Sequence, residues 1–182
     1  ADGKVRDIEK MPDKAIDLCL WNGAIRTSEN EYMARLLRAK SKVLVAFGSC
    51  ASEGCIPGLA NASTREEIFK TNYHDSPSLD NPKGIEPQTE TKVPEGTLHL
   101  PTFYDRLRTL DQTVEVDYYL PGCPPESDRI WDALVAILEG KLPPKGSVIG
   151  SNTTVCDTCE RKRTEKKIKS FKRTWQMQPN DT

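Results

Sequence analysis

Apolar positions follow two different periods along the chain, and segments of the two kinds succeed one another. Residues 15–20 (AIDLCL) and 42–47 (KVLVAF) are short, almost continuously apolar runs, which is typical of buried parallel strands. Between them, the apolar side chains of residues 32–37 recur at helical spacing. The succession of strand, helix and strand predicts an α/β domain with a parallel sheet.

Two capping signals indicate where helices begin. Ser28 is followed three residues later by Glu31, and Ser63 is followed in the same way by Glu66. In such a capping box, the hydroxyl and the carboxylate satisfy backbone N–H groups of the first turn. The sequence therefore predicts one helix that starts at Ser28 and a shorter one that starts at Ser63.

The second half of the chain repeats the alternation after a long irregular segment. Residues 72–101 are rich in Pro, Asp, Asn, Ser and Thr, which predicts a surface excursion without regular elements. Residues 102–110 are predicted to be helical, and residues 114–120 (VEVDYYL) to form a strand. A last helix is predicted from Pro125, with Gly140 ending it. Its inward-facing residues are predicted to be Ile130, Trp131, Leu134, Val135 and Leu138.

Composition narrows the class of protein. The chain has 182 residues, with 26 basic and 27 acidic side chains, which favours one compact domain with tails and argues against nucleic acid or an anionic membrane as the partner. One segment departs from this balance, because residues 161–173 (RKRTEKKIKSFKR) carry eight basic residues and one acidic residue. Such a run is either a solvated helix or tail, or a docking strip for an acidic subunit.

The cysteines indicate metal ligands in a reducing compartment. No run approaches the roughly 20 apolar residues of a membrane span, and no charged-then-apolar signal segment opens the chain. We therefore expect a soluble, cytoplasmic protein without a transmembrane segment. Six cysteines are too few for a disulfide scaffold in such a chain, and metal binding is the better explanation.

Two cysteines follow two of the predicted strands. Cys50 comes after 42–47, and Cys123 comes after 114–120, with Gly48 and Gly122 allowing close turns. Because ligands gather beyond the carboxyl ends of parallel strands, both thiols are expected at one edge of the sheet. Thiolates select iron-sulfur clusters, zinc or cuprous copper. The alternative is that each cysteine is a small buried residue.

The other four cysteines differ in how strongly they indicate a metal site. Cys156 and Cys159 form a C-x-x-C (VCDTC), which supplies half of a zinc or iron-sulfur site, although a redox disulfide has the same spacing. Cys19 lies inside a predicted strand and is expected in the core. Cys55 is either a spare thiol near Cys50 or a bystander. The two histidines, His74 and His99, are expected to be exposed loop residues. The sequence contains no nucleophile elbow, P-loop or dinucleotide fingerprint.

The two cysteine segments identify a family resemblance. GSCASEGCIPGLAN and LPGCPPESD resemble the cluster-binding domain of nickel-iron hydrogenase small subunits and of the related cluster subunit of respiratory complex I. Together with VCDTCERKR, they are most similar to cytoplasmic hydrogenases of the methyl-viologen-reducing or sulfhydrogenase type. The resemblance implies a three-layer, flavodoxin-like α/β domain at 1–145 that lacks its first strands. An irregular cluster-binding extension with a basic tail is expected at 146–182.

The resemblance also implies ligands and partners. Cys50 and Cys123 match two ligands of a proximal 4Fe-4S cluster, and the other two are expected to precede Ala1. Cys156 and Cys159 match the first ligands of downstream clusters, whose remaining cysteines are expected beyond Thr182. Cys55 stands where the family commonly has glycine, and it is not carried over as a ligand. The residues expected to surround the proximal cluster are Gly48, Ser49, Ala51, Gly122 and Pro124.

On this interpretation the chain relays electrons and has no bond-making residues of its own. Hydrogen would be split in a nickel-iron large subunit, and electrons would pass to a further subunit linked to heterodisulfide reductase, a nicotinamide or ferredoxin. Two alternatives remain open. A complex-I-like subunit would pass electrons to a quinone, although its C-terminus usually lacks the C-x-x-C extension, and a flavodoxin-like scaffold would bind partners without redox work.

Overall fold

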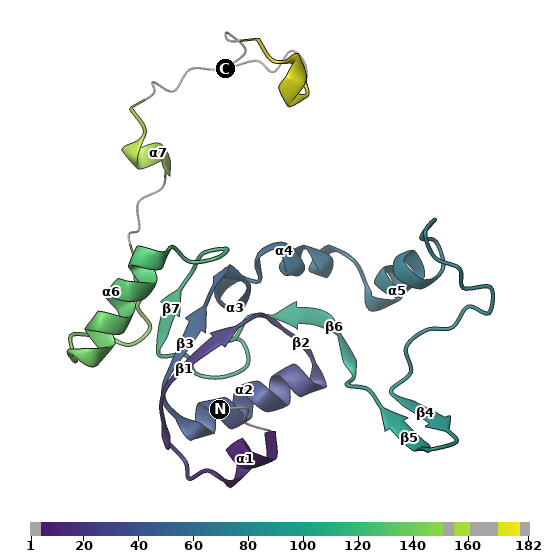
Figure 1. Cartoon of the computed structure of the whole chain (residues 1–182), viewed down its shortest axis with the longest axis horizontal. Coiled ribbons are helices and arrows are strands. Elements are labelled where there is room, and N and C mark those ends of the chain that lie inside the picture. The colour runs from purple at the N-terminus through teal and green to yellow at the C-terminus, as the bar shows by residue number, and fades with distance from the viewer. Residues whose placement is uncertain (1–4, 151–154, 161–170, 179–182) are drawn as a thin grey trace. The chain divides into compact units, whose positions relative to one another are not determined.

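The structure is a computed structural model that describes residues 5–150, 155–160 and 171–178. Contacts within the chain divide it into two compact units, residues 1–150 and residues 151–182 (Figure 1). This division does not test the domain boundary expected between residues 145 and 146, which stays a prediction. Of the basic run at 161–173, residues 161–170 lie outside the described residues.

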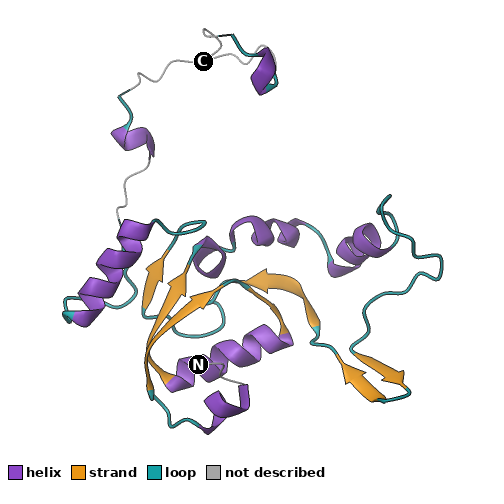
Figure 2. Cartoon of the chain, viewed as in Figure 1, coloured by secondary structure: helices purple, strands orange, loops and turns teal. Residues whose placement is uncertain are grey.

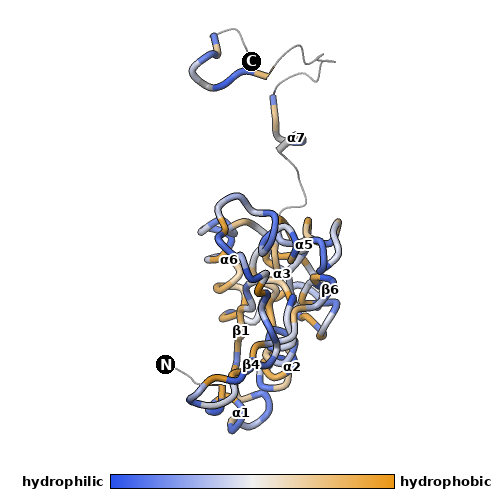
Figure 3. The backbone as a smooth tube through the Cα atoms, turned by 90° about the vertical axis from the view of Figure 1, so that its right-hand side faces the viewer, coloured by the Kyte–Doolittle hydropathy of each residue, from blue (hydrophilic) through white to orange (hydrophobic). Residues whose placement is uncertain are grey.

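A parallel sheet forms the centre of unit 1, as the sequence predicts. β3 (Ser41–Phe47) lies between β1 (Ile16–Asn22) and β7 (Tyr118–Leu120), and both neighbours run parallel to it (Figure 2). β1 is mostly apolar (Figure 3), as strands of parallel sheets usually are. The segment 146–149 runs along the other edge of β7, where the Ile149 N–H donates to the Tyr119 carbonyl at 2.7 Å.

Apart from α2 and α6, the other elements of the described chain are short. The remaining strands are β2 (Ile25–Thr27), β4 (Glu90–Val93), β5 (Gly96–His99) and β6 (Phe103–Arg108). The helices are α1 (Val5–Lys10), α2 (Ser28–Lys40), α3 (Ser49–Glu53), α4 (Cys55–Gly58), α5 (Arg65–Tyr73), α6 (Ser127–Leu138) and α7 (Val155–Thr158), and η1 (Leu59–Ala62) and η2 (Thr174–Gln176) are 3₁₀ turns.

Successive residues of β3 point into two separate cores. Leu44 lies in a buried cluster with Ala34 of α2 and Ala51 of α3, whereas Val45 lies in a second cluster with Ala133 of α6. Because side chains alternate across a strand, the helices cover opposite faces of the sheet. The three-layer α/β architecture is therefore confirmed.

The segment expected to be a helix at 102–110 is instead a strand, so that prediction is wrong. β6 pairs with β2 in an antiparallel ribbon. Its Leu107 is buried, and the Leu107 N–H donates to Asn61 Oδ1 at 2.8 Å. These partners from distant segments satisfy the backbone of β6 in an extended form, and tertiary contacts of this kind override local helix propensity.

Both predicted capping boxes are displaced by one residue. Thr27 caps α2 with Asn30, and Thr64 caps α5 with Glu67. At the first helix the predicted cap, Ser28, is engaged elsewhere, because its Oγ accepts the Thr102 N–H at 3.0 Å. Each helix start has two adjacent hydroxyl residues, and at α2 the bond from Thr102 accounts for the choice between them.

The last helix of unit 1 begins at Ser127, two residues later than predicted, and Gly140 follows its end with a φ of +67°. Two side chains predicted to face inward are exposed, since Trp131 is 67% and Leu138 is 86% accessible. The buried residue of this helix is Ala133. The face directed toward the sheet is therefore rotated from the predicted one.

Two more expectations need correction. The segment 72–101 contains a regular element, because β4 and β5 pair as an antiparallel hairpin. The strand expected at 114–120 is shorter than predicted and comprises only Tyr118–Leu120. Before it, the Val114 N–H donates to the Leu110 carbonyl at 2.9 Å in a turn.

Candidate metal centre

Cys50 and Cys123 both lie just beyond the carboxyl ends of parallel strands. Cys50 is the second residue of α3, which begins two residues after β3 ends. Cys123 follows the last residue of β7 by three positions. As β3 and β7 are adjacent and parallel, the two cysteine loops leave the sheet at the same edge.

Three hydrogen bonds connect the two loops directly. The Gly48 N–H donates to the Leu120 carbonyl at 2.8 Å, and the Ser49 N–H donates to the Gly122 carbonyl at 2.9 Å. The Gly122 N–H in turn donates to Ser49 Oγ at 3.1 Å. Backbone groups of one loop are thus satisfied by the other loop, which fixes their separation.

Both glycines of this edge have backbone conformations that favour glycine. Gly48 has a φ of +88° and Gly122 a φ of +140°, values that residues with a Cβ rarely adopt. A Cβ on Gly122 would also lie 2.5 Å from Pro125 Cα. Glycine at position 122 therefore allows the chain to turn back on itself directly before Cys123.

The other predicted neighbours of the site differ in their surroundings. Ala51 is fully buried in the core between α3 and the sheet, so only its backbone is available to a bound group. Its carbonyl accepts the Leu110 N–H at 2.9 Å. Pro124 follows Cys123 directly, in the loop that leads toward α6.

The surroundings of Cys50 disfavour its thiolate. Burial raises the pKa of the Cys50 thiol, and the neighbouring Cys55 and Cys123 raise it further. Cys123 is exposed, whereas Cys50 and Cys55 are partly buried. A metal bound here would have to displace thiol protons, as thiolate coordination always requires. Soft sulfur donors are the ligands that iron-sulfur clusters take.

The structure places Cys55 beside Cys50, which sequence reasoning left undecided. Cys55 has a φ of +45°, a left-handed conformation that is uncommon for residues other than glycine. Within the described ranges, no group of three or more His, Cys, Asp or Glu side chains is arranged to hold a metal ion. The edge therefore brings thiols together without completing a set of metal ligands among the described residues.

The C-x-x-C pair belongs to unit 2. Cys156 lies within α7, and Cys159 follows the end of that helical turn. Both side chains are exposed. Two accessible thiols three residues apart retain the spacing of a metal-binding half-site.

Cys19 lies against the core as expected, whereas the two histidines match their expected exposed loop positions only in part. Cys19 packs against the first core cluster, and burial raises its thiol pKa. His74 directly follows α5 as its C-cap, and its Nε2 lies 2.8 Å from Glu86 Oε1. His99 is exposed but belongs to β5 and not to a loop.

Among the described residues, none of the helices combines the length and the apolar character that a membrane span requires.

Comparisons with known proteins agree on one superfamily. The family model of the NADH ubiquinone oxidoreductase 20 Kd subunit matches residues 3–137. An iron-sulfur subunit of the F420-non-reducing hydrogenase from Archaeoglobus profundus is 44% identical, over 100% of this chain and 58% of that protein. A vhu subunit of the F420-non-reducing hydrogenase from Methanocaldococcus jannaschii is 34% identical, over 97% of this chain and 55% of that protein. The chain thus spans little more than half of these relatives.

A solved structure supports the same placement. A chain in the crystal structure of an NAD+-reducing NiFe-hydrogenase in the H2-reduced state is 31% identical and aligns with a TM-score of 0.62. The alignment covers 74% of this chain and 70% of that chain. The resemblance recognised from the cysteine segments is confirmed, and the chain belongs to the family of the NADH ubiquinone oxidoreductase 20 kDa subunit.

Proposed function

We propose that the chain is the electron-transfer subunit of a nickel-iron hydrogenase. The observation that carries this proposal is the pair of cysteine loops, joined by hydrogen bonds at one edge of the parallel sheet. Similarity to hydrogenase subunits from two archaea, and to a chain of a NiFe-hydrogenase structure, supports the same function.

Cys50 and Cys123 are proposed as two ligands of a proximal 4Fe-4S cluster. A cluster of this kind normally takes four thiolates, so two further cysteines are needed to complete the set. Cys156 and Cys159 are proposed to begin the ligand set of a downstream cluster. A bound cluster supplies reversible one-electron transfer, and the chain supplies its position and environment.

The loops of this edge have two tasks in the proposed function. Their cross-connected backbones hold Cys50 and Cys123 at a constant separation. Their backbone also surrounds the thiols, and the burial that it provides is one means by which a protein sets a reduction potential. The N–H groups of Gly48, Ser49 and Gly122 are already used between the loops and are not available to cluster sulfurs.

The proposed main partner is a large subunit with a nickel-iron centre. Exposed apolar side chains support a protein partner near the cysteine edge, since Ile56 is 70% and Leu59 is 72% accessible. Both follow Cys55 within a few residues, on α4 and η1. A second proposed partner receives the electrons and is linked to heterodisulfide reductase, a nicotinamide or ferredoxin.

A quinone-reducing role is the second candidate, and the family description favours it. A subunit of that kind would need a membrane-bound partner. The C-x-x-C of unit 2 and the similarity to an NAD+-reducing hydrogenase chain favour the hydrogenase function instead. A scaffold without redox activity is the remaining candidate.

The test is metal analysis of the full-length subunit, purified anaerobically with its partners. Iron and acid-labile sulfide are measured, and reduced cluster signals are recorded by low-temperature electron paramagnetic resonance. We expect several cluster signals, with Cys123→Ser removing or converting one and Cys156→Ser another. Zinc alone, or no metal, would favour the scaffold, and quinone-dependent turnover without hydrogen oxidation would favour the complex-I-like role.

A further inference from the structure

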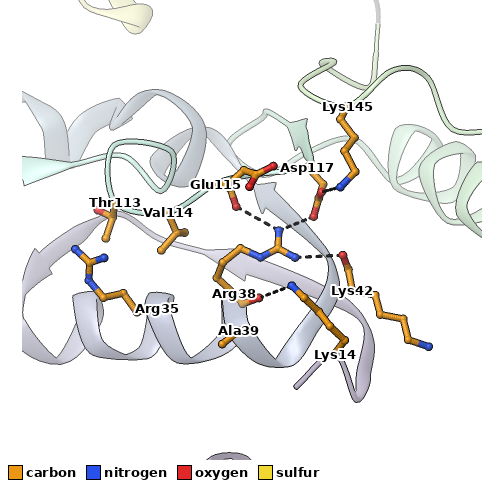
Figure 4. A pocket seen from close by; sticks show the side chains of 10 residues that line it. All are labelled: Lys14, Arg35, Arg38, Ala39, Lys42, Thr113, Val114, Glu115, Asp117 and Lys145. Atoms are coloured by element: carbon orange, nitrogen blue, oxygen red, sulfur yellow. Dashed lines mark hydrogen bonds and ion pairs between the residues drawn. The ribbon is translucent and has the colours of Figure 1, made fainter. Parts of the chain in front are cut away.

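A basic pocket lies at the end of the sheet opposite the cysteine loops. It is about 520 Å³ in volume and is formed by the end of α2, the start of β3 and the segment before β7. Five cationic side chains line it, namely Lys14, Arg35, Arg38, Lys42 and Lys145 (Figure 4). Glu115 and Asp117 are its two carboxylates, so positive charge exceeds negative charge by three.

Part of this charge has a structural role. Asp117 Oδ2 accepts from Arg38 Nη1 at 2.6 Å, and Asp117 Oδ1 lies 2.7 Å from Lys145 Nζ. Asp117 also accepts the Leu44 N–H at 2.8 Å. Arg38 and Lys145 thus compensate one buried carboxylate, and this pair of cations does not by itself indicate a ligand.

The other three cations are not explained by this network. Lys14 Nζ donates to the carbonyls of Arg38 and Ser41, which leaves its charge without a carboxylate in those contacts. Lys42 pairs with Asp17, which is 86% exposed. Such surface pairs contribute little to stability because water and salt screen them, so an incoming anion can replace Asp17 at low cost.

Arg35, the third of these cations, is paired within its own helix. Its Nη2 lies 2.6 Å from Glu31 Oε1, and its side chain is 59% exposed. Glu31 also accepts from Tyr104 and Arg108, so its carboxylate keeps two partners if Arg35 turns toward another anion. Arg35 is therefore available to a ligand of the pocket.

The lining indicates what kind of ligand fits. Ala39 and Val114 are the main apolar residues of the pocket, which is too little apolar surface for an aromatic or aliphatic small molecule. In Figure 4, Arg35 lies toward one end of the pocket and Lys42 and Lys145 toward the other, with Arg38 between them. An elongated row of cations suits several carboxylates on one chain better than a single compact anion.

We propose that this pocket binds an acidic peptide segment of a partner protein. Carboxylates of the segment pair with Arg35 and Lys42 at the two ends, while Lys14 adds a further positive charge to the lining. Complementary charge of this kind speeds association and fixes the orientation of a partner. As the pocket and the cysteine loops are at opposite ends of the sheet, this partner can bind while the cysteine edge faces another subunit.

The test measures binding of a fluorescein-labelled hexaglutamate peptide to the full-length subunit by fluorescence anisotropy at low and physiological salt. We expect saturable binding that weakens as salt rises, because exposed charges are screened within about 10 Å at 0.1 M. The double variant Arg35→Gln/Lys42→Gln is expected to bind about tenfold more weakly, the scale of two exposed charge contacts. Lys70→Gln/Lys92→Gln, which removes two exposed lysines outside the pocket, is expected to bind like the parent.

A further variant tests whether removing negative charge from the pocket strengthens peptide binding. Glu115→Gln removes a carboxylate from the pocket, and we expect it to bind the peptide more tightly than the parent. Equal weakening by the two double variants would overturn the proposal, since it would indicate nonspecific attraction. Pyrophosphate that binds while hexaglutamate does not would also overturn it, in favour of a small-anion site. Far-ultraviolet circular dichroism melts confirm that each variant is folded at the temperature of the assay.

Discussion

Arg38 and Asp117 form an ion pair of 2.6 Å across 79 residues of sequence. Arg38 extends from the last turn of α2, and Asp117 directly precedes β7. The pair therefore joins the helix that covers one face of the sheet to the strand whose end leads into the Cys123 loop. A contact at the amino end of the sheet thus contributes to the placement of the strands that position the cysteines.

Replacing Asp117 by Asn is expected to destabilise unit 1. The variant leaves Arg38 without its carboxylate, and removing one partner of a buried ion pair costs about 3 kcal/mol. The cost is smaller here because Lys145, the second partner, is largely exposed. We therefore expect the free energy of unfolding, measured with urea, to fall by about 2 kcal/mol. Lys145→Gln is the control, and a loss as large as that of Asp117→Asn would contradict this explanation.

The same carboxylate predicts an acid-dependent loss of stability. Hydrogen bonds from Lys145, Arg38 and Leu44 lower the pKa of Asp117 from 3.8 to about 2, against the opposing effect of burial. A lowered native pKa stabilises the fold above pH 3.8, and this contribution is lost as the pH falls toward 2. As the pH is lowered from 6 to 2, the free energy of unfolding measured with urea should therefore fall less in Asp117→Asn than in the parent. Parallel curves for the two proteins would refute the assignment.

Glu31 is predicted to hold the β2–β6 ribbon against α2. Its carboxylate accepts from Arg35 on its own helix and from Tyr104 and Arg108 on β6, and these bonds lower its pKa from 4.5 to about 2. Glu31→Gln should lower the melting temperature at pH 7, and the difference from the parent should shrink as the pH falls below 4.5 toward 2. Glu29→Gln, on the same first turn, is the matched control, and an equal effect there would show that the contacts to β6 are not the cause.

Cys55 is expected to tolerate glycine better than a branched residue. Its φ of +45° costs a residue with a Cβ about 1 kcal/mol relative to glycine. Cys55→Gly should therefore unfold at slightly higher urea concentration than the parent, and Cys55→Val at clearly lower concentration. A less stable Cys55→Gly variant would mean that the thiol contributes more through its neighbours than the backbone strain costs.

Gly122→Ala is expected to disturb the cysteine edge. The added methyl group would lie 2.5 Å from Pro125 Cα, so the loop must move, and we expect a destabilisation above about 2 kcal/mol. Gly23→Ala is a matched control, because Gly23 also has a positive φ of +96° but has open space around it. If both variants lose equal stability, backbone strain and not the contact with Pro125 is responsible. Iron content, measured in the assembled complex, should fall only in Gly122→Ala.

The central sheet and the shared edge of Cys50 and Cys123 were predictable from sequence. Short apolar runs and the rule that parallel strands end at one edge sufficed for both. The location of Cys55 was not predictable, because nothing in the local sequence shows that it lies beside Cys50. Its left-handed backbone follows Gly54, whose φ is +84°, and that conformation depends on how α3 and α4 meet.

The failures have a common physical cause. The helix predicted over 102–110 is wrong because the extended form of β6 depends on β2 and Asn61, which lie far away in sequence. The true helix caps differ from the predicted ones by one residue, and the choice at α2 depends on a bond from Thr102. The Asp117 network is not visible in the sequence, since its cationic partners Arg38 and Lys145 are spread along the chain. Periodicity reports a local preference, and these features are decided by distant contacts.

Two of the three hydrogen bonds between the cysteine loops join main chain to main chain, and only the third uses a side chain, that of Ser49. Apart from Gly48 and Gly122, whose backbone conformations favour glycine, the loops therefore keep the separation of the two thiols with little dependence on their side chains. Residues around the thiols can be exchanged, by evolution or by design, to alter polarity and packing while the spacing is kept. Ser49→Ala is the natural starting point for such redesign, because it removes one side-chain bond and leaves both backbone bonds in place.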